Sequence, residues 1–216
     1  MNELVRVKIC GLTTLDMVEV AVDAGAHAIG LVLSESPRRV DARRAAELFA
    51  AIPQGVERIA VLRRPGAAER ALLAALSWDG VQVDAEHARE TPLPSGAFLL
   101  PSFRDGPDVL ERMRSFGSLP SAPDSLRGSF LLDGPLGGGL GIEADRERAR
   151  RVGATDGLRL VLAGGLTPET VADLVRVVRP FAVDVSSGVE RSPGVKDAAR
   201  IRDFLAAVRD SSPANR

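Results

Sequence analysis

The sequence predicts an α/β protein with a single (βα)₈ (TIM) barrel, and three observations lead to this prediction. Eight short apolar runs alternate with amphipathic stretches along 216 residues. Most of the runs are rich in Val, Ile and Leu without polar alternation, which is typical of parallel strands buried on both faces. Eight strand–helix units in this length match a compact barrel. A doubly wound open sheet is the alternative, but it usually needs fewer strands, and no Gly-x-Gly-x-x-Gly follows the first run.

The apolar runs give the expected strands. In chain order they are Val5–Gly11, Ala28–Leu33, Arg58–Leu62, Gly80–Asp84, Ala97–Pro101, Ser129–Asp133, Leu158–Ala163 and Phe181–Ser186. In a barrel the carboxyl ends of all eight converge on one face, where barrel enzymes place their functional groups.

The stretches between the runs predict helices. Three of them carry apolar residues with the i, i+3, i+4, i+7 spacing of a helix face that packs on a sheet: Met17, Val20, Ala21 and Ala24; Val171, Leu174, Val175 and Val178; and Ile201, Phe204, Leu205 and Val208. Thr13 with Asp16 resembles a capping box. Thr167-Pro168-Glu169 offers a cap followed by Pro at the first helical position, and Asp197 can cap the last helix.

The domain organisation is simple, because no linker or second domain is recognisable. We expect one barrel domain over residues 1–209 and a flexible tail over residues 210–216. Ala85–Glu90 predicts only a short helix, and Ser118–Gly128 predicts a loop on the amino-terminal face of the barrel.

Composition excludes several classes of partner. The 28 basic and 29 acidic residues give a net charge of −1, which offers no basic excess for nucleic acid or an anionic membrane. The single cysteine cannot form an internal disulfide, and neither a signal peptide nor a membrane-spanning run is recognisable. We therefore expect a cytoplasmic protein.

Two strand ends carry residues suited to acid–base chemistry. Cys10 ends the first predicted strand and Asp133 ends the sixth. A lone Cys is more often a small buried hydrophobe than a reactant. A carboxyl group at the end of an apolar strand can have a raised pKa that suits a general acid, or it can simply hold a backbone amide of the following turn.

The last two strand ends suggest an anion site. Barrel enzymes often bind phosphate between the loops after strands seven and eight, through backbone N–H groups. The small residues there are Gly164, Gly165, Ser187 and Gly188. Ordinary turns are the alternative interpretation.

The remaining polar candidates are few. Arg38, after the second strand, could bind a substrate carboxylate through two parallel hydrogen bonds, although an arginine at such a position is more often a surface residue. His27 falls on the amino-terminal side of a barrel, and His87 is expected in solvent. No Cys/His cluster has the spacing of a zinc site, so we predict no metal.

Five segments, in order along nearly the whole chain, form a recognisable set: Lys8-Ile9-Cys10-Gly11-Leu12-Thr13, Ser36-Pro37-Arg38, Leu131-Leu132-Asp133, Leu162-Ala163-Gly164-Gly165-Leu166-Thr167-Pro168-Glu169, and Val183-Asp184-Val185-Ser186-Ser187-Gly188-Val189-Glu190. On these segments the chain resembles the phosphoribosylanthranilate isomerase family of tryptophan biosynthesis. The family is a (βα)₈ barrel, in agreement with the strand count.

The resemblance implies an Amadori rearrangement of N-(5-phosphoribosyl)anthranilate to 1-(2-carboxyphenylamino)-1-deoxyribulose 5-phosphate. It implies that Asp133 is the general acid for the ring oxygen and Cys10 the general base for the C2′ proton. A thiol that acts as a base must be a thiolate, so we expect neighbours such as Lys8, or the bound iminium charge, to lower its pKa.

The resemblance also assigns binding roles. It implies that Arg38 contacts the anthranilate carboxylate, that Asp184 lies near the ribose, and that the phosphate is bound by the backbones of Gly164, Gly165, Ser187 and Gly188. The implied partner is a small phosphorylated substrate, with no metal or organic cofactor. We expect a monomer or a homodimer.

The chain departs from the family pattern in two segments. Where the family usually has Val-Gln-Leu-His-Gly, this chain places Asp84 at the His and Ala85 at the Gly. After the sixth strand, Leu140 replaces a hydroxyl residue and Ala144 an aromatic one. Two alternatives therefore stay open: a related isomerase acting on another phosphoribosyl amine, and a non-catalytic barrel that binds a phosphosugar.

Overall fold

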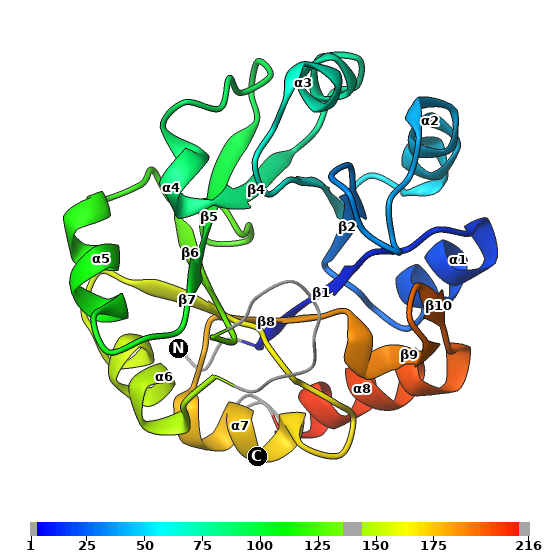
Figure 1. The fold of residues 1–216 in the computed structure, drawn as a ribbon. Coiled ribbons are helices and arrows are strands. Elements are labelled where there is room, and N and C mark those ends of the chain that lie inside the picture. Colours follow the sequence, from blue (N-terminus) through cyan, green and yellow to red (C-terminus); the bar gives the residue numbers. More distant parts are fainter. Residues whose placement is uncertain (1–3, 136–143, 212–216) are drawn as a thin grey trace.

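Eight parallel strands close into a barrel in the order β1 to β8, as Figure 1 shows. The structure is a computed structural model that describes residues 4–135 and 144–211. The strands are β1 (Arg6–Cys10), β2 (Ala28–Val32), β3 (Glu57–Val61), β4 (Gly80–Asp84), β5 (Phe98–Arg104), β6 (Ser129–Asp133), β7 (Arg159–Leu162) and β8 (Ala182–Val185). All eight predicted strands are confirmed. β5 runs three residues beyond its predicted end.

Pairing between the first and last strands closes the ring and excludes the open sheet. β8 pairs with β1 in parallel, with Lys8 in register with Asp184. On the other side of β1, Cys10 is in register with Gly30 of β2. Because side chains two apart on a strand share a face, Lys8 and Cys10 point the same way. The register therefore brings an acid, a base and a thiol to one part of the barrel.

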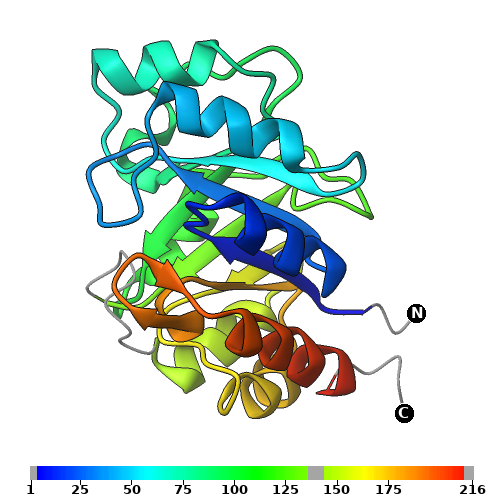
Figure 2. The same ribbon diagram turned by 90° about the vertical axis from the view of Figure 1, so that its right-hand side faces the viewer.

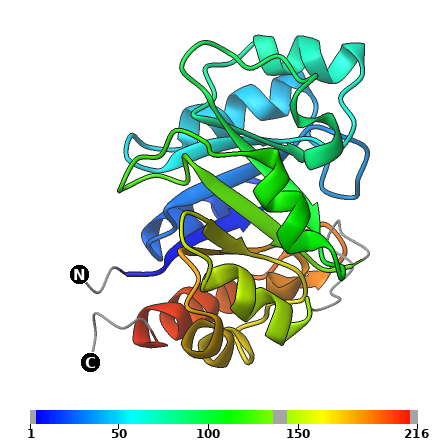
Figure 3. The same cartoon turned by 90° about the vertical axis from the view of Figure 1, so that its left-hand side faces the viewer.

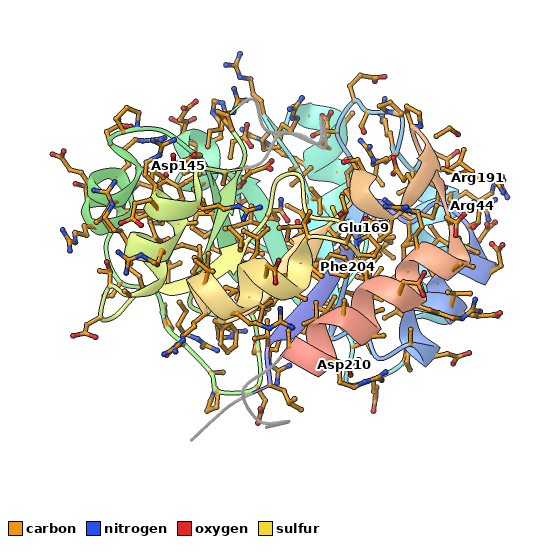
Figure 4. The ribbon with its side chains drawn as sticks, turned by 90° about the horizontal axis from the view of Figure 1, so that it is seen from below. Arg44, Asp145, Glu169, Arg191, Phe204 and Asp210 are labelled. Atoms are coloured by element: carbon orange, nitrogen blue, oxygen red, sulfur yellow. The ribbon has the colours of Figure 1, made fainter. Side chains whose placement is uncertain are left out.

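One helix follows each strand, and together the helices form the outer layer in Figure 1. They are α1 (Leu15–Asp23), α2 (Ala42–Ala51), α3 (Ala67–Ala74), α4 (Ala85–Ala88), α5 (Val109–Phe116), α6 (Arg146–Gly153), α7 (Val171–Val178) and α8 (Ala198–Ser211). The predicted apolar faces of α7 and α8 are buried, and Phe204 of α8 lies against the barrel wall (Figure 4). In α1 the predicted Ala21 is fully buried together with Val18, and the predicted Met17, Val20 and Ala24 pack partly buried against the core.

Two of the three predicted helix caps are wrong. α1 begins after Thr14, not Thr13, because the first helical hydrogen bond runs from the Val18 N–H to the Thr14 carbonyl. α7 begins after Thr170, because the hydroxyl of Thr170 accepts the Thr167 N–H and forms a turn ahead of the helix.

The cap of α8 is confirmed, and its end is later than expected. Asp197 Oδ1 accepts the N–H groups of Ala199 and Arg200 at 2.9 and 3.0 Å. The helix continues to Ser211, two residues into the segment predicted as a tail, where the Ser211 hydroxyl donates to the Val208 carbonyl. Residues 212–216 lie outside the described part of the chain.

A small hairpin marks the carboxyl-terminal end of the barrel. After the 3₁₀ turn η1 (Ser187–Val189), the short strands β9 (Glu190–Ser192) and β10 (Val195–Lys196) pair antiparallel. Figures 2 and 3, from opposite sides, show this hairpin at one end of the barrel and both chain ends at the other. The sequence pattern did not predict the hairpin. No helix among the described residues is long and apolar enough to cross a membrane.

Candidate active site

A cavity of about 310 Å³ opens at the carboxyl ends of the strands. All eight residues predicted for the site line it: Cys10, Arg38, Asp133, Gly164, Gly165, Asp184, Ser187 and Gly188. The topology thus brings together side chains and turns that are far apart in the sequence.

Cys10 ends β1 and is only 7% exposed. A β-carbon built on Gly30 would lie 3.1 Å from both Cys10 Sγ and Lys8 Nζ, so the missing side chain leaves room for the thiol and the ammonium beside each other. Burial raises the pKa of the Cys10 thiol, and the charges of Lys8 and Lys196, which act to lower it, do not offset this. The prediction that neighbouring charges lower the pKa of Cys10 below that of a free thiol is therefore wrong for the protein without substrate. Loss of hydration on burial outweighs the effect of the two lysines.

Lys8 and Asp184 form a buried ion pair. Lys8 Nζ lies 2.8 Å from Asp184 Oδ1, with the lysine side chain fully buried and that of Asp184 8% exposed. Burial acts most strongly, to lower the pKa of Lys8, but Asp184 and Cys10 both act to raise it and together bring the pKa above its ordinary value. A charged lysine inside an apolar strand is thereby stabilised next to the thiol.

Arg38 and Lys196 share one carboxylate, that of Glu190. Arg38 donates from Nε and one terminal nitrogen to the two Glu190 oxygens at 2.7 and 2.8 Å. Lys196 Nζ donates to Glu190 at 2.8 Å and to the Ser186 carbonyl at 2.9 Å. The Ser186 hydroxyl in turn donates to the Cys10 carbonyl at 3.1 Å. The hairpin therefore ties the loop after β2 to the ends of β1 and β8.

These contacts shift the acidities of the buried groups. Burial acts to raise the pKa of Glu190, but the hydrogen bonds from Arg38 and Lys196 bring it below its ordinary value. Burial lowers the pKa of Lys196, and Glu190 compensates only in part. Arg38 thus lies on the cavity wall, as predicted, but with two of its donors already bound to Glu190.

Asp133 ends β6 and is half-buried. Its Oδ1 accepts the N–H of Gly134 at 2.8 Å, which is the structural role considered from the sequence. The same side chain lines the cavity with Cys10. The backbone therefore holds the Asp133 carboxylate in place while it still faces the space where a ligand would bind.

The turns after β7 and β8 present backbone to the cavity. Gly164 and Gly165 have φ of +80° and +69°, in the left-handed region that favours glycine. Within the described residues their N–H groups make no hydrogen bond. A β-carbon at Gly188 would collide with the Leu166 carbonyl, so the two turns pack closely together.

The cavity wall also contains polar residues that the sequence did not single out. Gln82, Asp84 and Ser102, on β4 and β5, line it, as does Arg63 after β3. Gln82 Oε1 is buried, with no hydrogen-bond partner in the described chain. Asp84 stood out only as a departure from a family pattern. All four residues lie at or near the carboxyl ends of adjacent strands, and this position alone could have identified them as cavity residues. Leu140 and the glycines around it lie outside the described residues.

Fold and cavity define a (βα)₈-barrel protein with its functional groups at the carboxyl ends of the strands. The sequence pattern of the family described as N-(5'phosphoribosyl)anthranilate (PRA) isomerase matches residues 7–207. The chain belongs to this family.

Individual relatives agree over nearly the whole chain. The N-(5'-phosphoribosyl)anthranilate isomerase of Pseudomonas aeruginosa (strain UCBPP-PA14) is 39% identical over 95% of each chain. That of Bordetella parapertussis is 41% identical over 94% of this chain and 95% of its own.

Solved structures are similar as well. The phosphoribosyl anthranilate isomerase of Thermotoga maritima is 31% identical, with a TM-score of 0.76 over 95% of this chain and 98% of that one. An isomerase in complex with reduced 1-(o-carboxyphenylamino)-1-deoxyribulose 5-phosphate is 30% identical, with a TM-score of 0.74 over the same shares.

Proposed function

We propose that this protein isomerises N-(5-phosphoribosyl)anthranilate to 1-(2-carboxyphenylamino)-1-deoxyribulose 5-phosphate, a step of tryptophan biosynthesis. One observation carries the proposal: Cys10 and Asp133 line the same cavity as the glycine turn after β7. An aldose–ketose rearrangement of a phosphorylated sugar needs an acid, a base and an anion site, and a carboxyl group, a thiol and a glycine turn can supply them.

In the proposed reaction Asp133 is the general acid and Cys10 the general base. Asp133 gives a proton to the ring oxygen as the C1′–O bond breaks, and the nitrogen lone pair forms an iminium ion. The Cys10 thiolate removes the C2′ proton, and the C–H electrons form the C1′–C2′ double bond of an enolamine. A proton added at C1′, with loss of the C2′ hydroxyl proton as the C2′ carbonyl forms, then gives the amino ketose. Atoms and electrons balance within the substrate, so no redox partner is needed.

The raised pKa of Cys10 fits this sequence of steps. A buried thiolate is costly in the protein alone, and the positive iminium formed by ring opening supplies an opposite charge where the base must act. We therefore place loss of the thiol proton, to solvent at the mouth of the cavity, after ring opening. Lys8 and Lys196, which lower the pKa of the thiol, contribute in the same direction.

The binding roles follow the walls of the cavity. The N–H groups of Gly164 and Gly165, with Ser187 and Gly188, would bind the phosphate, since unbonded backbone donors suit an anion. Asp184 would face the ribose. Arg38 would contact the anthranilate carboxylate from the wall of the cavity.

The test is a direct assay of the purified protein. Wild-type protein is expected to consume the fluorescence of phosphoribosylanthranilate, and Cys10→Ala and Asp133→Asn each to lower kcat by about 10²–10⁴-fold. Arg209→Gln, an exposed change on α8, serves as control. Wild-type protein that leaves the fluorescence unchanged refutes the proposal.

Two further expectations accompany this function. We propose that the protein acts in the cytoplasm, where its small phosphorylated substrate would be made and consumed. A monomer or a homodimer is the expected assembly, and sedimentation velocity distinguishes them.

A further inference from the structure

Three charged residues lie at the ends of neighbouring strands on the side of the barrel away from the β7 and β8 turns. Arg63 follows β3 by two residues, Asp84 is the last residue of β4, and Arg104 is the last residue of β5. We call these three residues the β3–β5 rim. Arg63 and Asp84 line the cavity.

The rim carries one positive charge in excess. Arg104 lies 3.6 Å from an oxygen of Asp84, with side chains 54% and 29% exposed. This is an ion-pair distance, too long for a hydrogen bond. Burial raises the pKa of Asp84. Arg104 and Arg63 both act to lower it, but the net direction is upward. One carboxylate thus stands between two guanidinium groups.

Arg63 differs from Arg38 in what it already binds. The Arg38 guanidinium is held by both oxygens of Glu190. The Arg63 backbone N–H donates to the Ser34 hydroxyl, but its guanidinium makes no hydrogen bond or ion pair with any described residue. Arg63 is also exposed, so its five donors remain available in a fixed planar arrangement.

The position of the rim limits which part of a substrate it can meet. With the phosphate at the β7 and β8 turns and the sugar between Cys10 and Asp133, the wall formed by β2 to β5 is left for the group on nitrogen. An aromatic amine with an ortho carboxylate would bring a negative charge to this wall. A guanidinium binds such a carboxylate through two parallel hydrogen bonds.

We propose that Arg63 is a specificity-determining residue that binds the carboxylate of the aromatic amine, while Asp84 is paired with Arg104. This inference rests on the proposed function, and it adds a contact to the one assigned to Arg38. It also gives Asp84 a role: its negative charge would attract the Arg63 guanidinium toward the cavity without a direct bond.

The test compares two inert product analogues, the reduced 5-phosphate amino sugars that carry either a 2-carboxyphenylamino or a phenylamino group. Calorimetry gives the ratio of their dissociation constants, the carboxylate preference. Arg63→Gln is expected to lower the preference about tenfold, by loss of charge-assisted hydrogen bonds at an exposed site. Arg63→Lys, which keeps the charge but not the fork, should retain part of it.

A matched control separates contact from overall charge. Arg64→Gln removes the same charge one residue along the chain, from a side chain that donates to His87. It should leave the preference unchanged. Equal losses in Arg63→Gln and Arg64→Gln, or none in Arg63→Gln, overturn the inference while the isomerase assay still supports the proposed function. Wild-type protein that binds neither analogue overturns both.

Discussion

Lys8 of β1 and Asp184 of β8 form a 2.8 Å ion pair across the seam that closes the barrel, two residues before Cys10. The pair has two consequences. It fixes a positive charge beside the thiol, and it makes each partner dependent on the other, because a single buried charge is far more costly than a matched pair.

Breaking this pair should destabilise the fold. Lys8→Met leaves the Asp184 carboxylate buried without its partner, and we expect the free energy of unfolding in urea to fall by about 3–5 kcal/mol. The double change Lys8→Met with Asp184→Leu removes both charges and should regain most of the loss. Equal stability of the single and double variants would contradict this account.

The thiol should make both the alkylation of Cys10 and the stability of the protein depend on pH. Because burial raises the pKa of Cys10, the rate of alkylation by iodoacetamide should rise with pH through a midpoint above that of a free thiol. By the same linkage, the contribution of Cys10 to stability is full below the unfolded thiol's pKa and is lost as pH rises through the folded value. Cys10→Ser should abolish the alkylation. An alkylation midpoint below that of a free thiol would show that Lys8 and Lys196 affect the pKa of Cys10 more strongly than burial does.

Substitution of the glycine after β7 should affect the site beyond backbone strain. In Gly164→Ala, φ of +80° costs about 1–2 kcal/mol, and the new methyl group would meet the Gly134 amide and come within 3.1 Å of Asp133 Oδ1. Gly157→Ala is the matched control, with φ of +79° and no atom within 4 Å of the new group. Both should lose stability, and only Gly164→Ala should also lose kcat/KM. Similar kcat/KM values for the two variants would refute a steric role.

The hairpin carboxylate should control Arg38. Glu190→Gln weakens the bonds to Arg38 and Lys196, and these side chains are at most 9% exposed. We therefore expect the free energy of unfolding to fall by about 3 kcal/mol and KM to rise. Glu147→Gln on α6 breaks an equally bidentate pair with Arg150 in full solvent and should change neither property. An unchanged KM in Glu190→Gln would show that the hairpin does not contribute to substrate binding.

The sequence alone was sufficient for the barrel and for the residues gathered at its mouth. Eight apolar runs gave eight strands because parallel strands buried on both faces leave a simple pattern. Cys10 and Asp133 could be placed together because strand ends in a barrel converge. The caps of α1 and α7 were missed because neighbouring threonines compete for one local role.

What the sequence could not supply depends on long-range contacts. Nothing near Glu190 in the chain shows that it binds Arg38, 152 residues away. The direction of the Cys10 shift follows from burial, which depends on the packing of the whole barrel. Nothing in the sequence distinguishes Arg63 from the other arginines, because its place on the cavity wall depends on the pairing of β3, β4 and β5.

The placement of the chain ends has a practical consequence. The start of β1 and the end of α8 lie at the end of the barrel opposite the hairpin (Figure 2), and the cavity opens at the hairpin end, where the strands terminate. A fluorescent protein, an immobilisation tag or a second enzyme joined at either end would therefore sit on the far side of the molecule. Such fusions should leave diffusion of small molecules to the mouth unhindered.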